Sequence, residues 1–322
     1  MKLQILPVRG SHFQADLTCL KVFNGATGAW QMHLQAAATL APQMVNAQLS
    51  LSEDGSAHLT SQRRLEDLAV LSCEDHTTIT LLLGSFIWFD ILACASTGSR
   101  PFLALDHILI LEGDRIHLEE LMGCENWVMI VIFQISELDH WKKDSERNCK
   151  LSIAELAKRG ALIEACLQQR LEKIAVRDTS QNDDISGATL RFSKCTRTII
   201  TEIFALAALT YLHVVISGAN PGVPEIIESV SRTVTAFKAL SDARMLRWLV
   251  WPFCVTGCLV SEEDESVFRG LISASKLSEM TVGTCIEAVK LIEECWKRRQ
   301  TGLGNCDWVS VMHSLGNLIL LG

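Results

Sequence analysis

The chain has 322 residues, of which 48% are hydrophobic, and its formal net charge is -8 at pH 7. A hydrophobic content at the top of the globular range excludes a largely disordered chain. The acidic balance is the opposite of the basic footprint of nucleic-acid-binding proteins, which argues against direct DNA contact by these residues. The length allows two ordinary domains or one large domain that buries about three quarters of its unfolded surface without disulfides.

The N-terminal part predicts an irregular lead-in over residues 1–20 and then a helix. Thr27 is a good N-cap, and apolar residues follow it at helical spacing. Pro42 either closes this helix or begins the next element. Polar, turn-forming residues predict a loop over residues 51–60, and a further helix is expected over residues 61–73.

The most informative stretch is an apolar helix over residues 79–95 that ends in a turn. Apolar residues recur there at helical spacing, but Asp90 falls inside the apolar stripe, where an unpaired carboxylate is costly. Arg100, between the helix-stopping Gly98 and Pro101, is the nearest candidate partner in the sequence. Two interpretations remain: the Asp90–Arg100 pair pins the helix end, or it belongs to an effector pocket beside the turn.

The middle of the chain predicts short helical pieces followed by two long helices. The short pieces are expected in a connection over residues 106–122, and Asn126 is expected to cap the first long helix. Ser152 and Glu155 form a capping box that opens the second long helix. The polar, aperiodic segment 178–189 is expected to be a flexible loop.

The C-terminal part predicts several helices packed around one helix, residues 190–217, that is apolar nearly all round and therefore buried. His213 within it is expected to be a core histidine and not a catalyst. Pro252 is expected to kink a later helix. The other expected helices cover residues 223–240, 242–259, 265–275 and 281–299, and a last one begins at Asp307.

Strand patterns are nearly absent, because no stretch alternates apolar and polar residues over six positions between turns. The predicted fold is therefore all-α, a large helical domain of about ten or more packed helices with no significant sheet. The most apolar windows, residues 79–95 and 199–217, each contain residues that interrupt a clean membrane span. We expect both to be core helices and the protein to have no membrane contact.

The twelve cysteines are scattered, and none forms the Cys-x2-Cys pair that a zinc cluster needs. Cys254 and Cys258 share a helix face without a second pair nearby in sequence, so buried small residues in a reducing compartment are favoured over metal ligands. The chain also lacks nucleotide-binding glycine loops, the hydrolase nucleophile elbow and the His-Glu-x-x-His motif. We expect no enzyme activity, no metal and no cofactor; the less favoured alternative is an enzyme whose site is assembled between helices.

Three motifs agree in order and spacing with a known family. They are GATGAWQMHLQAA at residues 25–37, WFDILACASTGSRPFL at residues 88–103 and LMGCENWVM at residues 121–129. Together they resemble the fungal-specific transcription factor domain, the regulatory region of Zn2Cys6 proteins, and the group similar to the acriflavine sensitivity control protein. The resemblance extends over residues 21–322, which would form the regulatory domain.

This resemblance implies a helical regulatory domain of a fungal, nuclear transcriptional regulator; the cytoplasm is the alternative location. The six-cysteine zinc cluster that reads DNA in this family is absent, so DNA binding is expected only indirectly or through an N-terminal cluster that the chain lacks. Expected partners are another protein or a second copy of the chain, together with a small-molecule effector. The effector pocket is placed at the motif positions Trp88, Asp90, Arg100 and Trp127. A helical protein-interaction scaffold is the alternative function.

Overall fold

The computed structural model describes residues 30–50, 73–178, 192–275, 284–302 and 307–322. Every regular element within these residues is a helix, which confirms the prediction of a large all-α fold. The predicted lead-in, and nearly all of the helix at 61–73 and the loop at 178–189, lie outside the described residues. The helices are α2 (Trp30–Ser50), α3 (Cys73–Thr97), α4 (His107–Glu112), α5 (Leu118–Leu121), α6 (Asn126–Arg147), α7 (Ile153–Asp178), α8 (Lys194–Ser217), α9 (Pro224–Lys238), the 3-10 helix η1 (Ala243–Trp248), α10 (Val250–Gly257), α11 (Glu262–Ser275), α12 (Cys285–Gln300) and α13 (Trp308–Leu315).

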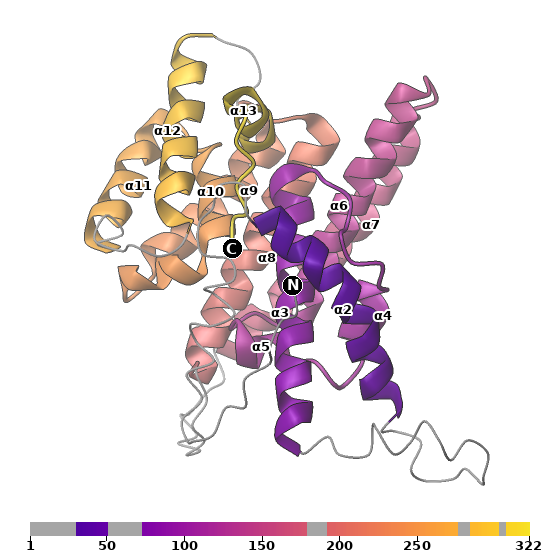
Figure 1. Cartoon of the computed structure of the whole chain (residues 1–322). Coiled ribbons are helices and arrows are strands. Elements are labelled where there is room, and N and C mark those ends of the chain that lie inside the picture. Colours follow the sequence, from indigo (N-terminus) through magenta and orange to yellow (C-terminus); the bar gives the residue numbers. More distant parts are fainter. Residues whose placement is uncertain (1–29, 51–72, 179–191, 276–283, 303–306) are drawn as a thin grey trace, which may run out of the picture.

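Helix α8 is the centre of the molecule. It packs against α6, α7, α9 and α10, and most of its side chains from Ile200 onward are buried. Helices α10, α11 and α12 gather on one side of it, away from α6 and α7 (Figure 1). A helix that is apolar nearly all round can be covered from several sides at once, as the sequence predicts for this segment.

A chain of aromatic contacts connects the two sides of the molecule through α8. Trp88 of α3 packs edge-on against Phe204 of α8 with ring centroids 5.3 Å apart, and Phe204 stacks on Trp251 of α10 at 6.0 Å. Tyr211, two turns further along α8, contacts both Trp251 at 6.0 Å and Trp308 of α13 at 5.8 Å. The side chain of Trp88, one of the predicted pocket residues, therefore lies in the core.

Two helical segments are long and apolar enough to cross a membrane by length and composition, Thr77–Thr97 and Lys194–Ser217. Inside the molecule, 67% and 78% of their apolar windows are buried against other helices. This burial agrees with the prediction that both are core helices.

The predicted effects of two prolines are wrong. Helix α2 neither ends nor begins at Pro42 but continues through it to Ser50, although the proline removes one backbone hydrogen bond. Pro252 does not kink a long helix. The helical backbone is interrupted at Leu249, between η1 and α10. Pro252 lies in the first turn of α10, where a backbone N–H has no hydrogen-bond acceptor within the helix, so the proline costs no helical hydrogen bond.

Candidate functional site

Asp90 is completely buried, and three donor groups converge on its carboxylate. One oxygen accepts the N–H of Phe102 at 2.8 Å; the other accepts the N–H of Leu103 at 3.1 Å and lies 2.9 Å from Nε2 of His107. The Nδ1 atom of His107 lies 3.0 Å from the carbonyl oxygen of Leu105, so a ring with a proton on each nitrogen donates to both oxygens. This buried cluster fixes the turn after α3 and the start of α4.

The predicted pair between Asp90 and Arg100 does not form. The side chain of Arg100 is 62% exposed and pairs with Asp144 of α6. The carboxylate of Asp90 is already occupied by the backbone of the turn and by His107, which is the buried partner that the prediction missed. An exposed pair such as Arg100–Asp144 contributes only about 0–1 kcal/mol.

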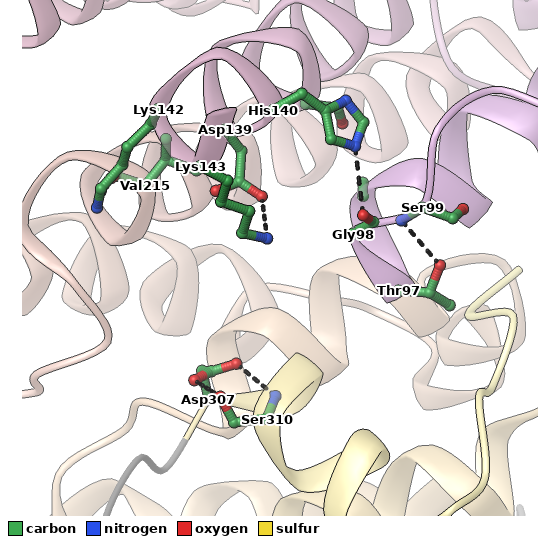
Figure 2. A network of polar contacts seen from close by, with 12 residues as sticks. Thr97, Gly98, Ser99, Asp139, His140, Lys142, Lys143, Val215, Asp307 and Ser310 are labelled. Carbon is green, nitrogen blue, oxygen red and sulfur yellow. Dashed lines mark hydrogen bonds and ion pairs between the residues drawn. The ribbon is translucent and has the colours of Figure 1, made fainter. Parts of the chain in front are cut away.

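The turn after α3 is also fixed from its other side (Figure 2). The carbonyl oxygen of Gly98 lies 3.3 Å from Nε2 of the buried His140, and Lys143 donates to Asp139 at 2.7 Å. A Cβ atom at Gly98, which has a φ of +67°, would lie 3.1 Å from Nζ of Lys143. Nearby, Asp307 accepts the N–H of Ser310 at 2.7 Å and caps α13, as the sequence predicts. The turn that follows Asp90 is therefore closely packed.

A cavity of about 860 Å³ lies between α6, α7 and α8, with α4 and α5 at one side. Of the four predicted pocket residues only Trp127 lines it; Trp88, Asp90 and Arg100 do not. The indole N–H of Trp127 donates to the carboxylate of Glu125 at 2.7 Å, and the guanidinium of Arg170 lies 5.1 Å from the ring centroid. Three apolar side chains complete this part of the wall, Leu111, Ile130 and Val131.

Charged side chains of both signs surround the cavity. The carboxylates come from α4, α5 and the residue before α6, and the basic groups come from α7 and the first turn of α8. The sequence did not single out the basic groups, because the two helices that carry them are separated along the chain. The carboxylates are Glu112, Glu119 and Glu125, and the basic residues are Arg170, Lys194 and Arg197.

Asn126 holds the segment that borders the cavity. Its Nδ2 donates to the carbonyl oxygens of Leu111 at 2.8 Å and Ile116 at 2.6 Å, and its Oδ1 accepts the N–H of Leu118 at 2.9 Å. The predicted role of Asn126 as the N-cap of α6 is wrong, because Glu125 occupies that position. The amide side chain instead joins α6 to the ends of α4 and α5.

We expect Asn126→Ala to lower the free energy of unfolding by about 2–3 kcal/mol, because three backbone groups lose their partner. Urea unfolding followed by circular dichroism measures this change. Asn148→Ala, at the opposite end of α6, is the matched control: its amide makes one exposed contact with the carbonyl of Asp144, and we expect a loss of under about 0.5 kcal/mol. Equal losses in the two variants would contradict the role of Asn126.

A second, more apolar cavity of about 640 Å³ lies further along α6 and α7 and shares Gln134 and Cys166 with the first. There the guanidinium of Arg159 lies 4.2 Å from the ring centroid of Trp141. Helices α6 and α7 therefore line both cavities, and each cavity has a tryptophan–arginine contact.

The buried histidine and cysteine side chains away from these cavities are part of the core. Nδ1 of His213 lies 3.3 Å from the hydroxyl oxygen of Ser229, as expected for a core histidine. Cys258 is hydrogen-bonded to Cys254 and Cys295, and burial raises the pKa of Cys258 well above its ordinary value. A buried neutral thiol is neither a nucleophile nor a metal ligand. In the part of the chain that the structure describes, no three ligand side chains lie close enough to hold a metal ion.

Comparison with known proteins gives one family. Residues 16–322 match the family described as "Fungal specific transcription factor domain". The trichothecene biosynthesis transcription regulator TRI10 of Trichoderma arundinaceum is 33% identical over 85% of this chain and 63% of its own length. TRI10 of Fusarium sporotrichioides is 29% identical over 91% of this chain and 68% of its own length.

A more distant relative is the ustiloxin B cluster transcription factor ustR of Aspergillus flavus, 28% identical over 90% of this chain and 51% of its own length. The chain thus spans only about half to two thirds of these regulators. No solved structure matches the chain significantly.

Proposed function

The chain belongs to the fungal-specific transcription factor domain family, and from this membership we propose that it is the regulatory domain of a fungal regulator of a biosynthetic pathway. The observation that carries the proposal is the match along nearly the whole chain to regulators named for such pathways. The relatives are longer than this chain, and we assign DNA contact to other parts of the regulator or to a partner. The net charge of -8 supports that division.

The remaining parts of the proposal follow from this role. The regulator acts in the nucleus, and its partners are another protein or a second copy of the chain. The domain has no catalytic role of its own, because the named relatives are transcription regulators. Its large cavity between α6, α7 and α8 supports a domain that responds to a small molecule over a purely structural scaffold.

A transcription assay tests the proposed function. We expect the chain, fused to the DNA-binding domain of a bacterial repressor in a fungal cell, to change transcription of a reporter that carries the repressor's operator. An increase identifies an activating domain and a decrease identifies a repressing one. The control is the DNA-binding domain alone, expressed at the same level. A reporter that responds equally to both proteins would contradict a regulatory function and favour a passive scaffold.

A further inference from the structure

Three basic side chains line the 860 Å³ cavity without an ion-pair partner among the described residues: Arg170, Lys194 and Arg197. The Nε of Arg197 is buried and has no hydrogen-bond partner there, although a buried N–H group normally has one. The guanidinium of Arg170 lies over the ring of Trp127, 5.1 Å from its centroid. This wall of the cavity therefore presents three basic side chains that can pair with an anion.

None of the three carboxylates of the cavity forms an ion pair with these basic groups in the described part of the chain. Glu125 accepts the indole N–H of Trp127, and Glu119 lies 3.4 Å from Nδ1 of His117. Glu112 is exposed at the end of α4. The first turns of α6 and α8 also line the cavity, and the N-terminal end of a helix favours an anion.

Apolar side chains line one part of the cavity, beside polar side chains such as Asn126, Gln134 and Thr198. The cavity is also of the right size for a small molecule. Trp127 supplies a broad aromatic face, and Leu111, Ile130 and Val131 supply aliphatic surface. Ligand cavities in proteins typically enclose about 300–1,000 Å³, and they combine such apolar walls with a few polar groups that orient the ligand. A cavity of about 860 Å³ lies in this range.

We propose that this cavity binds a small molecule with a carboxylate on an apolar body. The carboxylate pairs with Arg197 and Lys194, since the fork of a guanidinium matches a carboxylate in two parallel hydrogen bonds. The apolar body packs against Trp127 and the aliphatic side chains beside it. This inference rests on the proposed function, for which it supplies the class of effector.

Isothermal titration calorimetry on the purified whole chain tests this with two matched probe pairs. Naphthalene-1-acetate is compared with naphthalene-1-acetamide, and octanoate is compared with octan-1-ol. We expect at least one carboxylate to bind more tightly than its neutral partner. Arg197→Gln should weaken the binding of that carboxylate about tenfold or more and leave the neutral partner unchanged. Arg197→Lys keeps the charge and loses the fork of the guanidinium. Its affinity for the carboxylate should lie between that of the unsubstituted chain and that of Arg197→Gln.

Two further variants keep the test decisive. Lys194→Gln changes an exposed side chain, so the fold tolerates it, and it should also weaken carboxylate binding. Arg147→Gln removes an exposed arginine of α6 outside the cavity and should leave binding unchanged. The proposal is overturned if neither carboxylate binds better than its neutral partner, or if the preference survives in both Arg197→Gln and Lys194→Gln.

The reporter assay separates this inference from the proposed function. A chain that prefers carboxylates but leaves the reporter unchanged contradicts the regulatory function alone. A chain that changes the reporter without any carboxylate preference contradicts the ligand site alone.

Discussion

Asp90→Ala is expected to lower the free energy of unfolding by about 3–5 kcal/mol, because removing a buried carboxylate leaves the three groups that bind it without a partner. The N–H groups of Phe102 and Leu103 and the ring of His107 all lose their acceptor. The N–H of Leu103 and the ring of His107 cannot turn to water, since both residues are buried. Urea unfolding followed by circular dichroism measures the change.

Two controls separate the acceptor role of Asp90 from its packing. Asp90→Asn keeps the shape but turns an NH2 group toward donors, so most of the loss should remain. Arg100→Ala removes only an exposed pair with Asp144 and should cost under about 1 kcal/mol. A stable Asp90→Asn variant, or an Arg100→Ala loss as large as that of Asp90→Ala, would refute the assignment of the buried partners.

The sequence predicts those features of the fold that depend on local patterns. The apolar periodicity of α8 predicts its central position, and the alternation of caps and breaks predicts most helices. Asp307 and Ser152 cap the helices that follow them, because a side-chain oxygen next to free N–H groups is a local interaction. The burial of Asp90 also follows from its place in an apolar stripe.

Contacts between distant segments explain what the sequence does not predict. His107 lies 17 residues after Asp90, and its adjacency to Asp106 gives no sign of that contact. Arg170 and Arg197 meet at one cavity only because α7 and α8 pack side by side. Trp127 lines the cavity, whereas Trp88 lies in the core on a helix covered on several sides. The predicted pocket residues, taken from two motifs, thus do not share one site.

Trp251→Ala is the second variant for which we expect a large effect, a loss of about 3–5 kcal/mol in the free energy of unfolding. Trp251 is completely buried and contacts both Phe204 and Tyr211 of α8. Removing its ring leaves a cavity between α8 and α10 that rigid helices cannot close. The substitution removes one of the eight tryptophans and so changes the fluorescence of the protein. Urea unfolding should therefore be followed by far-ultraviolet circular dichroism and not by fluorescence.

Trp251→Phe distinguishes the contribution of the ring from that of the indole N–H. The Nε1 atom of Trp251 is buried and has no hydrogen-bond partner among the described residues, so phenylalanine removes an unsatisfied donor and keeps much of the aromatic contact. We expect a loss of only about 1–2 kcal/mol, since the remaining void is smaller. Equal losses for the two variants would mean that the indole N–H has a stabilising partner. A small loss for Trp251→Ala would instead mean that the aromatic contacts across α8 contribute little to the stability of the helix packing.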